Sequence, residues 1–330
     1  MMKAMVIDRF GGPEVFQAAT LPDPVAGPGE VLVAIAAASV NPVDWKLRTH
    51  GPAIAPALPA VLGTDFAGHV VALGDGVSGF AVGDAVYGCA GGVRGMPGAY
   101  AGMIAADALL IAHAPKGLSM REAAALPLVT ITAWEGLHDR ARIGAGDTVL
   151  IHGGTGGVGH IALQVAAAAG ARVFATVSSA EKATLARTLG AAETIDYRNE
   201  MPEAYVARLT GGRGFDVVFD ATGGKDIATS FAAVRTSGQV VTIVSQYTAD
   251  LAPMHGKGLS LHVVFMLLPM LTGLGRDRHG AILTEAARLV EAGKLRPLLD
   301  PHRFPLEDVA AAHAHLESGK AIGKVVLEVA

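Results

Sequence analysis

The sequence lacks the cysteines that a disulfide framework or a multi-cysteine zinc lobe would require. Cys89 is the single cysteine among 330 residues, so no disulfide can form within one chain. We therefore expect a reducing compartment. The simplest role for Cys89 itself is that of a small buried residue.

The sequence also lacks a long apolar run and a strong charge of one sign. The first 14 residues contain no apolar core of signal-peptide length, and Pro269 interrupts the most apolar later run, residues 261–275. The formal net charge is -4 and no basic block stands out, which argues against nucleic acid and membrane as partners. We expect a cytoplasmic protein that acts on a small molecule.

Chain length and a change of sequence texture predict two domains. Up to about residue 120, short β-type runs alternate with turns rich in glycine and proline, which predicts a small barrel-like β unit. The next part alternates apolar strands with amphipathic helices, as in a parallel sheet covered on both faces. The tail is too small for a core of its own, so we expect residues 1–122 and 269–330 to form one domain around a central domain at 123–268.

The predicted fold class is therefore α/β, with a doubly wound parallel sheet beside a β-barrel domain. Glycines at 63, 68, 74, 76, 79 and 83 are expected at the tight corners of the barrel. The expected strands are residues 3–8, 30–39, 68–74, 84–88, 148–152, 172–177, 193–196, 216–221, 239–244, 261–267 and 323–329, and the expected helices include 119–141, 280–295 and 306–318.

A glycine-rich turn follows one expected strand and opens a helix. Its glycines match GxGxxG within a strand–helix–strand unit of about 30 residues, the context that dinucleotide binding requires. Such glycines let backbone N–H groups approach a pyrophosphate at the helix N-terminus. A structural turn without a ligand is the alternative. The residues expected to bind the cofactor here are Gly154, Thr155, Gly156, Gly157, Val158 and Gly159.

The second strand of this unit lacks the terminal acid that would accept the ribose hydroxyls of NAD. Ser178, Ser179 and Lys182 stand there instead, and their hydroxyl and ammonium groups suit the 2'-phosphate of NADP(H). Tyr197 and Arg198 follow the third strand and are expected at the same sheet edge. The serines can also cap the next helix, and an acid from elsewhere could still reach the ribose. We predict NADP(H) as the cofactor.

Six segments in a fixed order carry a family resemblance: residues 39–46, 62–88, 123–137, 149–182, 212–224 and 315–329. Together they resemble the medium-chain dehydrogenase/reductase superfamily and, within it, the zinc-free quinone oxidoreductase (zeta-crystallin-like) branch. The resemblance spans essentially the whole chain. It implies a GroES-like catalytic domain formed by both chain ends, a Rossmann domain between them, an active site in their cleft, and a homodimer that pairs the edge strand at 262–268. An apolar edge strand independently favours a partner.

The resemblance also implies that no catalytic zinc is bound. The ligand positions of zinc-dependent members fall on Asn41, on Thr64 with Asp65, and on Leu128. Among these only Asp65 has a side chain that zinc accepts readily. The histidines form no HxxxH or Cys/His cluster: His313 and His315 point to different sides of one expected helix, and His50, His279 and His302 are expected in polar loops. The expected metal content is none.

By family position, several side chains are implied in the active site. Asn41 and Thr132 would orient the nicotinamide, Thr64 and Asp65 would line the pocket left by the metal, and Trp45 would stack on a flat acceptor. Capping of the turn at residues 40–44 by Asn41 and Asp44, and wall packing by Trp45, are the structural alternatives.

Two further positions are implied near the cofactor. Lys324 falls where family members carry a group that reaches back toward it, with a solvent-facing lysine as the alternative. Thr222 follows another strand at the switch point, with an ordinary turn as the alternative.

We predict an NADPH-dependent, metal-independent oxidoreductase that passes hydride to quinones or α,β-unsaturated carbonyls, because such acceptors stabilise negative charge without a Lewis acid. An alcohol or aldehyde dehydrogenase of the same superfamily is one alternative. A non-catalytic NADPH-binding protein is the other, although the acidic balance argues against an RNA-associated role. The physiological acceptor, the proton donor, one- or two-electron quinone reduction, and dimer or tetramer stay open.

Overall fold

The computed structural model describes residues 1–224 and 227–329, and the chain divides into two compact units. Unit 1 consists of residues 1–131 and 267–330, and unit 2 of residues 132–266. The chain first crosses from one to the other inside helix α3 (Pro127–Trp134). The domain borders expected from the sequence, 122/123 and 268/269, fall inside helices α2 (Met120–Ala124) and α9 (Leu268–Thr272).

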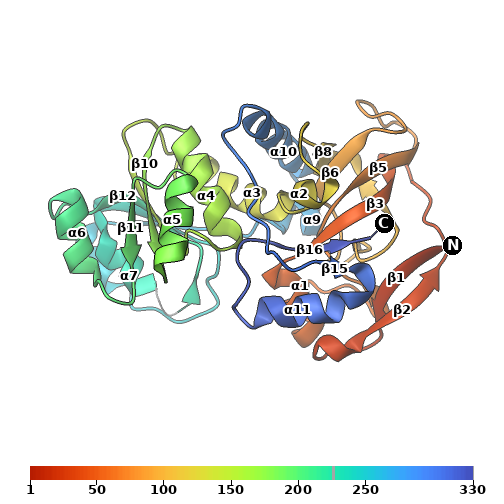
Figure 1. Cartoon of the computed structure of the whole chain (residues 1–330), viewed down its shortest axis with the longest axis horizontal. Helices are drawn as coiled ribbons and strands as arrows, with labels where there is room; N and C mark the ends of the chain where they lie inside the picture. The colour runs from red at the N-terminus through yellow and green to blue at the C-terminus, as the bar shows by residue number, and fades with distance from the viewer. Residues whose placement is uncertain (225–226, 330) are drawn as a thin grey trace. The chain divides into compact units, whose positions relative to one another are not determined.

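Unit 1 is organised around one long strand, β3 (Glu30–Val40), which is coloured red-orange in Figure 1. It pairs antiparallel with β5 (Asp65–Leu73) along most of its length, with β7 (Met103–Asp107) at its beginning and with β16 (Val325–Glu328) at its end. Two register shifts in the β3–β5 ladder interrupt the regular pairing, as bulges in a strongly bent sheet do. The last strand of the chain thereby lies beside one of the first.

The remaining elements of unit 1 complete this sheet and a smaller one. The small sheet contains β2 (Phe16–Leu21), β1 (Met2–Ile7) and β4 (Ala60–Val61), and the larger one adds β6 (Ala85–Cys89), β8 (Ile111–His113) and β15 (Phe304–Pro305). The helices are α1 (Pro42–His50), α2, α9, α10 (Arg276–Glu291) and α11 (Val309–Glu317), with short 3₁₀ turns η1 (Pro13–Val15), η2 (Ala108–Leu110) and η5 (Leu306–Asp308).

The corner glycines behave as the sequence predicts. A Cβ atom on Gly74 would lie 1.8 Å from the carbonyl oxygen of Gly27, and one on Gly68 would lie 2.0 Å from that of Ala34. The other four, Gly63, Gly76, Gly79 and Gly83, have positive φ. The prediction that this spacing marks tight corners is confirmed.

Unit 2 is a doubly wound parallel sheet. Among the described residues its strand order is β11-β10-β9-β12-β13-β14, and every neighbouring pair is parallel. The strands are β9 (Thr148–His152), β10 (Arg172–Val177), β11 (Glu193–Asp196), β12 (Phe215–Asp220), β13 (Val234–Thr242) and β14 (Ser260–Val263). The helices are α4 (Gly157–Ala168), α5 (Ala180–Thr188), α6 (Pro202–Thr210), α7 (Ile227–Ala233) and α8 (Ala252–Lys257), with the π-helical turn η3 (Glu135–Arg140).

The order of these strands fixes where a ligand can approach the sheet. The chain runs outward from β9 to β11, returns to β12 and runs outward again to β14. Right-handed crossovers in opposite directions place their helices on opposite faces of the sheet. The carboxyl ends of β9 and β12 therefore lie at the topological switch point, where open α/β sheets bind their ligands. The predicted α/β fold class is confirmed.

Two expected elements differ from the observed ones. The expected helix 119–141 is divided into α2, α3 and η3, because Pro127 cannot continue the helix that precedes it. The expected strand 261–267 ends at Val263, and α9 begins at Leu268. Among residues 1–224 and 227–329, no helix combines the length and the apolar character needed to cross a membrane.

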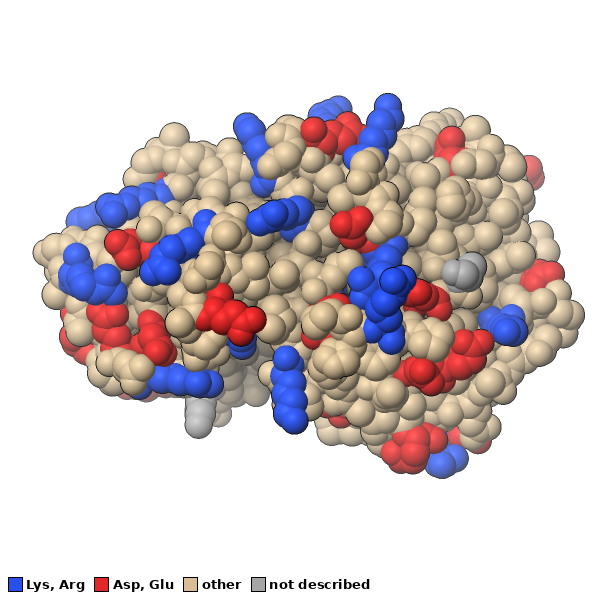
Figure 2. Space-filling view, in the orientation of Figure 1, with Lys and Arg blue, Asp and Glu red and all other residues tan. Residues whose placement is uncertain are grey.

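Figure 2 shows acidic and basic side chains interspersed on the drawn face of both units. The expectation that nucleic acid and membrane are not partners stays a prediction.

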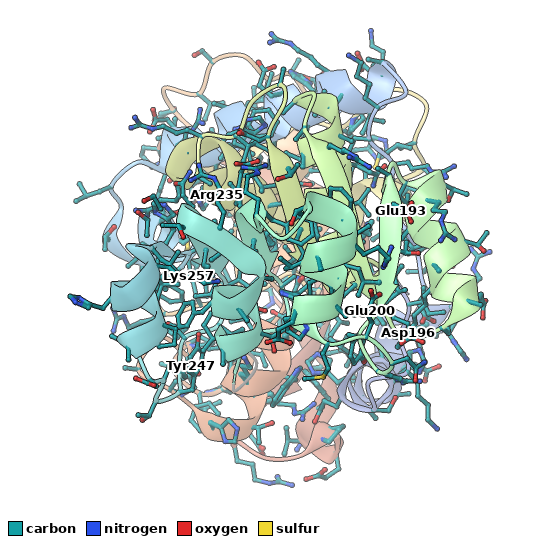
Figure 3. All side chains as sticks on the ribbon, turned by 90° about the vertical axis from the view of Figure 1, so that its left-hand side faces the viewer. Glu193, Asp196, Glu200, Arg235, Tyr247 and Lys257 are labelled. Atoms are coloured by element: carbon teal, nitrogen blue, oxygen red, sulfur yellow. The ribbon has the colours of Figure 1, made fainter. Side chains whose placement is uncertain are left out.

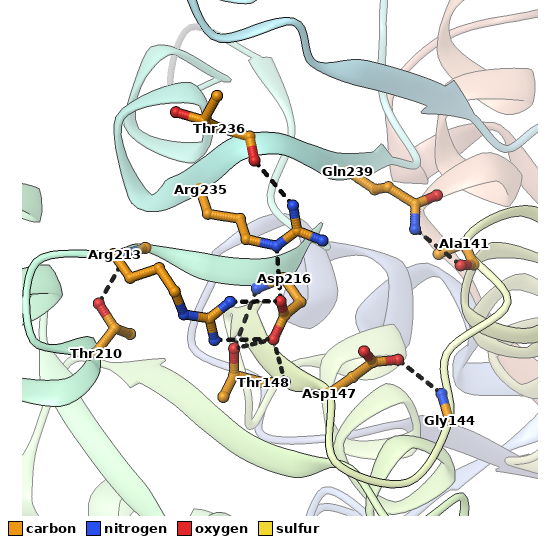
Figure 4. A network of polar contacts seen from close by, with 11 residues as sticks. Ala141, Gly144, Asp147, Thr148, Thr210, Arg213, Asp216, Arg235, Thr236 and Gln239 are labelled. Atoms are coloured by element: carbon orange, nitrogen blue, oxygen red, sulfur yellow. Dashed lines mark hydrogen bonds and ion pairs between the residues drawn. The ribbon is translucent and has the colours of Figure 1, made fainter.

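A charged network ties together the amino ends of three strands in unit 2 (Figure 4). The Asp216 carboxylate accepts hydrogen bonds from Arg213 (2.8 and 3.2 Å), from Arg235 Nε (2.7 Å) and from the backbone and hydroxyl of Thr148 (2.9 and 2.6 Å). Burial opposes ionisation, but these donors outweigh it and hold the pKa of Asp216 well below its usual range. The network therefore stabilises the edge of the sheet opposite the carboxyl ends of the strands.

We predict that Asp216→Asn lowers the free energy of unfolding by about 1.5–3 kcal/mol, because the new amide N–H₂ faces donors rather than acceptors. Urea denaturation at neutral pH measures the change. Glu285→Gln is the matched control, because it removes an exposed ion pair with Arg288 and should cost less than about 1 kcal/mol. Equal losses in the two variants would contradict the prediction.

Candidate functional site

The glycine turn of unit 2 lies between β9 and α4, at the carboxyl edge of the sheet. A Cβ atom on Gly159 would lie 2.1 Å from the carbonyl oxygen of Gly153, and one on Gly154 would lie 2.6 Å from the Cβ of Ala175. Only glycine allows the helix and the turn to approach so closely. Gly156 is exposed and forms the N-cap of α4, whose first N–H groups face outward beyond the helix. The glycine turn and the N-terminus of α4 together have the form of a pyrophosphate-binding site.

The residues expected around the ribose follow two neighbouring strands. Ser178 comes directly after β10 and Tyr197 directly after β11, and the last residues of these strands, Val177 and Asp196, are register partners. Tyr197 is 54% exposed. Ser179 is the N-cap of α5, where its Oγ accepts a hydrogen bond of 3.2 Å from the backbone N–H of Lys182. The structure therefore brings these residues to one edge, and Ser179 also has the capping role considered as an alternative.

Two acids lie at the same edge, and both are engaged locally (Figure 3). Asp196 accepts hydrogen bonds from the backbone N–H of Arg198 (3.1 Å) and the side chain of Asn199 (2.8 Å). Glu200 pairs with Arg208 through bonds of 2.9 and 2.7 Å. Asp196 is the acid that stands nearest the end of β10 in register, and its carboxylate is held within its own turn.

Thr222 lies in a tight turn after β12. The buried carboxylate of Asp220 accepts hydrogen bonds from the backbone (3.1 Å) and hydroxyl (2.8 Å) of Thr222 and from the backbone of Gly223 (2.8 Å). The turn considered as an alternative for Thr222 is therefore present at the switch point. Thr132, by contrast, is a buried residue of α3.

In unit 1, four polar residues form a buried cluster. Asn41 precedes α1, Thr64 precedes β5, Asp65 is the first residue of β5, and Lys324 precedes β16. Lys324 is 2% exposed and the other three are 0% exposed. They meet because β5 and β16 both pair with β3, which ends at Val40. The cluster therefore joins residues more than 250 positions apart in the sequence.

Within this cluster the Lys324 ammonium faces three acceptors. It donates a hydrogen bond to Oδ1 of Asn41, lies 3.3 Å from the carbonyl oxygen of Val40, and lies 3.5 Å from Oδ2 of Asp65. Burial lowers the pKa of Lys324, and the neighbouring Asp65 opposes that shift. Lys324 is thus an internal cation, and the solvent-facing alternative for this residue is wrong.

The Asp65 carboxylate is fully engaged by other groups. Its Oδ2 accepts hydrogen bonds from Ser39 Oγ (3.0 Å) and Asn41 Nδ2 (2.8 Å), and its Oδ1 accepts one from the backbone N–H of Leu128 (2.9 Å). Asn41 Nδ2 also donates to Thr64 Oγ1 over 3.1 Å. Such a set satisfies a buried negative charge.

This arrangement does not fit a zinc ion. The positions that carry zinc ligands in zinc-dependent relatives hold an amide, a hydroxyl and an alkyl chain, at Asn41, Thr64 and Leu128. Zinc prefers thiolate, imidazole and carboxylate. The one carboxylate, Asp65, already faces the Lys324 ammonium and three hydrogen-bond donors.

Trp45 stands apart from the cluster on α1. Its ring is half-buried, with Lys46 Nζ 5.8 Å from its centroid and the His50 ring edge-on at 6.4 Å. His50 is the last residue of α1, and His279 is a buried residue of α10. The expectation that these two histidines lie in polar loops is wrong, because a polar sequence context did not exclude helix.

Sequence reasoning missed most of the titratable groups around the cluster. Burial raises the pKa of Asp44 to about 7, although a 2.7 Å hydrogen bond from the Asn41 N–H to Oδ2 lowers it. Burial and the nearby Asp65 raise the pKa of the Cys89 thiol. Tyr100 bonds His313 over 3.1 Å, and burial raises the pKa of this phenol. The spacing of Asn41 and Asp44 indicated a capping pair, and the capping box at the start of α1 confirms this alternative.

We predict that Lys324 and Asp65 are energetically coupled. Lys324→Met should lower the free energy of unfolding by about 3–5 kcal/mol, because it leaves a buried carboxylate without its counter-ion. Asp65→Asn should also destabilise, and the double variant should lose less than the sum of the two by about 1–3 kcal/mol. Denaturant unfolding of the four proteins measures the cycle, and strict additivity would contradict the coupling.

We also predict that Asp44 makes stability depend on pH. Its pKa is about 7 in the folded chain and about 3.9 in an unfolded one. Between these values the folded state binds the extra proton, so the contribution of Asp44 is complete below pH 4 and is lost as pH rises toward 7. The difference in free energy of unfolding between wild type and Asp44→Asn should fall by up to about 1.4 kcal/mol per pH unit.

The comparison with Asp44→Asn is needed because another group titrates in the opposite sense. Burial, followed by the charge of Arg48, lowers the pKa of His313 to about 3, so its contribution rises with pH in both proteins. Urea denaturation at a series of pH values separates the two effects. Parallel curves for wild type and variant would refute the role given to Asp44.

Two family models match the chain. Residues 27–116 match one described as "Alcohol dehydrogenase GroES-like domain", and residues 189–327 match one described as "Zinc-binding dehydrogenase". The zinc in the second description belongs to that family's name, and the donors described above do not provide such a site.

Three curated relatives illustrate the range of similar proteins. The chain is 36% identical over 309 residues to the phthioceranic/hydroxyphthioceranic acid synthase of Mycobacterium tuberculosis. The matched region is 92% of this chain but only 14% of the synthase. The chain is 34% identical to the quinone oxidoreductase of Pseudomonas aeruginosa, with 99% of both chains covered. It is 35% identical to the 2-methylene-furan-3-one reductase of Solanum lycopersicum, covering 99% of this chain and 79% of the relative.

Two solved structures are similar along the full chain. An alcohol dehydrogenase superfamily protein from Novosphingobium aromaticivorans has a TM-score of 0.95 at 44% identity, with 100% of each chain covered. The quinone oxidoreductase of Escherichia coli, solved as a complex with NADPH, has a TM-score of 0.87 at 29% identity, with 99% of this chain and 100% of that chain covered.

Proposed function

The chain belongs to the medium-chain dehydrogenase/reductase superfamily, in its quinone oxidoreductase branch, and from this premise we propose that it is an NADPH-dependent reductase of quinones or α,β-unsaturated carbonyls that works without a metal. Membership makes it an NAD(P)-dependent oxidoreductase. The choice of nucleotide, the acceptor class and the absence of a metal are the proposal.

The observation that carries the proposal is the Lys324 ammonium beside Asp65. Lys324 Nζ lies 3.5 Å from Oδ2 of Asp65 and donates to Asn41, and by the family resemblance Asn41 and Asp65 fall at positions where zinc-dependent members carry ligands. A buried ammonium whose N–H donors already face protein acceptors cannot bind and polarise an alcohol as an open zinc site does. Acceptors that stabilise negative charge by themselves, such as quinones and enones, are therefore favoured.

The ribose edge supports NADPH over NADH. Ser178 and Lys182, both half-buried, stand at the end of β10, and Tyr197 is exposed at the end of β11. The nearest acid in register, Asp196, is committed to Arg198 and Asn199. Hydroxyl and ammonium groups favour a phosphate, whereas a free carboxylate would repel it.

We assign complementary tasks to the two units. When bound, NADPH supplies hydride from nicotinamide C4. The α4 turn holds the pyrophosphate, and Thr132 and Thr222 stay in the assignment as cofactor neighbours. Asn41, Thr64 and Asp65 are buried, so their role is to keep the polar cluster of unit 1 rigid. Trp45, in contrast, offers a half-buried ring on which a flat acceptor can stack.

We also propose a homodimer through the edge of unit 2. β14 is the terminal strand of its sheet, and its last residue, Val263, and the nearby Phe265 are 43% and 41% exposed. An apolar edge strand is protected when a second copy pairs with it. The interface expected at 262–268 would contain this strand end.

The proposal is tested by oxidation of NADPH and NADH, measured side by side on chelator-treated protein with 1,4-benzoquinone, 9,10-phenanthrenequinone and a 2-alkenal. We expect NADPH-preferring turnover that chelation does not reduce. Lys182→Ala should raise KM for NADPH about tenfold, the equivalent of about 1.4 kcal/mol, and leave KM for NADH unchanged. Lys294→Ala, at an exposed position of unit 1, is the control.

Preference for NADH would refute the phosphate pocket at Ser178 and Lys182. Activity that disappears with the chelator and returns with zinc would refute metal independence. Tight NADPH binding without turnover of any acceptor would favour a non-catalytic role over the proposed reductase.

A further inference from the structure

Three side chains of unit 1 converge away from the buried Lys324 cluster. Asp300 and His302 lie in the segment between α10 and α11, and His315 lies in α11. Oδ1 of Asp300 is 2.8 Å from Nδ1 of His302, and Oδ2 is 3.1 Å from Nε2 of His315. The two imidazole rings are 4.4 Å apart, and the three ligand atoms all lie within 4.8 Å of one another.

We propose that Asp300, His302 and His315 form a binding site for a divalent transition-metal ion of the zinc type. Two imidazole nitrogens and one carboxylate oxygen are a ligand set that such ions accept, with water in the fourth position. Bonds of about 2.0–2.1 Å in a tetrahedron place neighbouring ligand atoms about 3.3 Å apart. The observed nitrogen–oxygen separations are 2.8 Å, from His302 Nδ1 to Oδ1 of Asp300, and 3.1 Å, from His315 Nε2 to Oδ2. Each imidazole thus faces its own carboxylate oxygen, and an ion between the three side chains requires these pairs to separate by about half an ångström or less.

The carboxylate is already oriented for this role. Asp300 is 2% exposed, and the backbone N–H groups of His302 and Ile322 each donate to it over 3.0 Å. Backbone donors of this kind hold a carboxylate ligand in place before the ion arrives.

The surroundings leave a path for the ion. The His302 side chain is 60% exposed, whereas His315 is 16% exposed, so the open coordination position faces water. The Phe304 ring lies nearly parallel to that of His302, with centroids 6.2 Å apart. Arg121 donates to the carbonyl oxygens of Asp300 (3.2 Å) and His302 (3.1 Å), and Glu328, 3.4 Å from Arg121 Nε, balances its charge.

A bound ion would connect the segment before β15 to helix α11. The site contains none of the residues assigned to hydride transfer, so it stands or falls independently of the proposed reductase activity. It also differs from the zinc position considered above, because no ligand is shared.

The test uses the full chain after dialysis against a chelator. Zn²⁺ titration by calorimetry should show one ion per chain, and Co²⁺ should produce the visible absorption band of a tetrahedral site. His302→Gln and His315→Gln should each weaken Zn²⁺ binding by at least about tenfold. His69→Gln, at an exposed position on β5, is the matched control and should bind as wild type does.

Several results would overturn the site. These are the absence of saturable Zn²⁺ binding, or unchanged affinity in either histidine variant. Far-UV circular dichroism verifies the fold of His302→Gln, whose side chain is largely exposed. If His315→Gln does not fold, imidazole NMR signals of the wild type decide: Zn²⁺ must shift those of His302 and His315, and unshifted signals would show a hydrogen-bonded, metal-free cluster.

Discussion

The buried ion pair between Lys324 and Asp65 is the constraint on which unit 1 depends. A carboxylate and an ammonium that are both excluded from water are tolerated only when they meet and their remaining hydrogen-bonding capacity is filled. That requires the start of β5, the end of β3 and the approach to β16 to lie together, which closes the sheet with the last strand of the chain. The Lys324–Asp65 pair and the strand topology of unit 1 therefore depend on each other.

In unit 2 the charged network lies at the amino ends of the strands, at the edge opposite the glycine turn. At the amino ends of its strands Asp216 is clamped by two arginines and Thr148, so this edge is closed by side chains. At the carboxyl edge the glycine turn presents backbone N–H groups instead, and the acids nearby are held within their own turns. One edge thus stabilises the sheet and the other stays available to a ligand, a division that the doubly wound topology makes possible.

Local sequence signals predicted local features well. The glycine turn, the apolar strands of the parallel sheet and the corner glycines were readable because each depends on neighbours within a few residues. Lys324 was not, since the direction of its side chain depends on Asn41 and Asp65, far away in the sequence. The same reason hid the convergence of Asp300 and His315. The end of β14 at Val263 was missed because the apolar run continues without a break into α9.

The return of β16 to β3 also has a consequence for biosynthesis. A chain emerging from the ribosome exposes the whole of unit 2, a continuous segment, before Lys324 is made. Until then Asp65 has no counter-ion, and β3 lacks one of its neighbours. The usual order, in which the N-terminal part of a chain folds first, is reversed here: the inserted sheet can fold while the unit encoded first waits for the final strand.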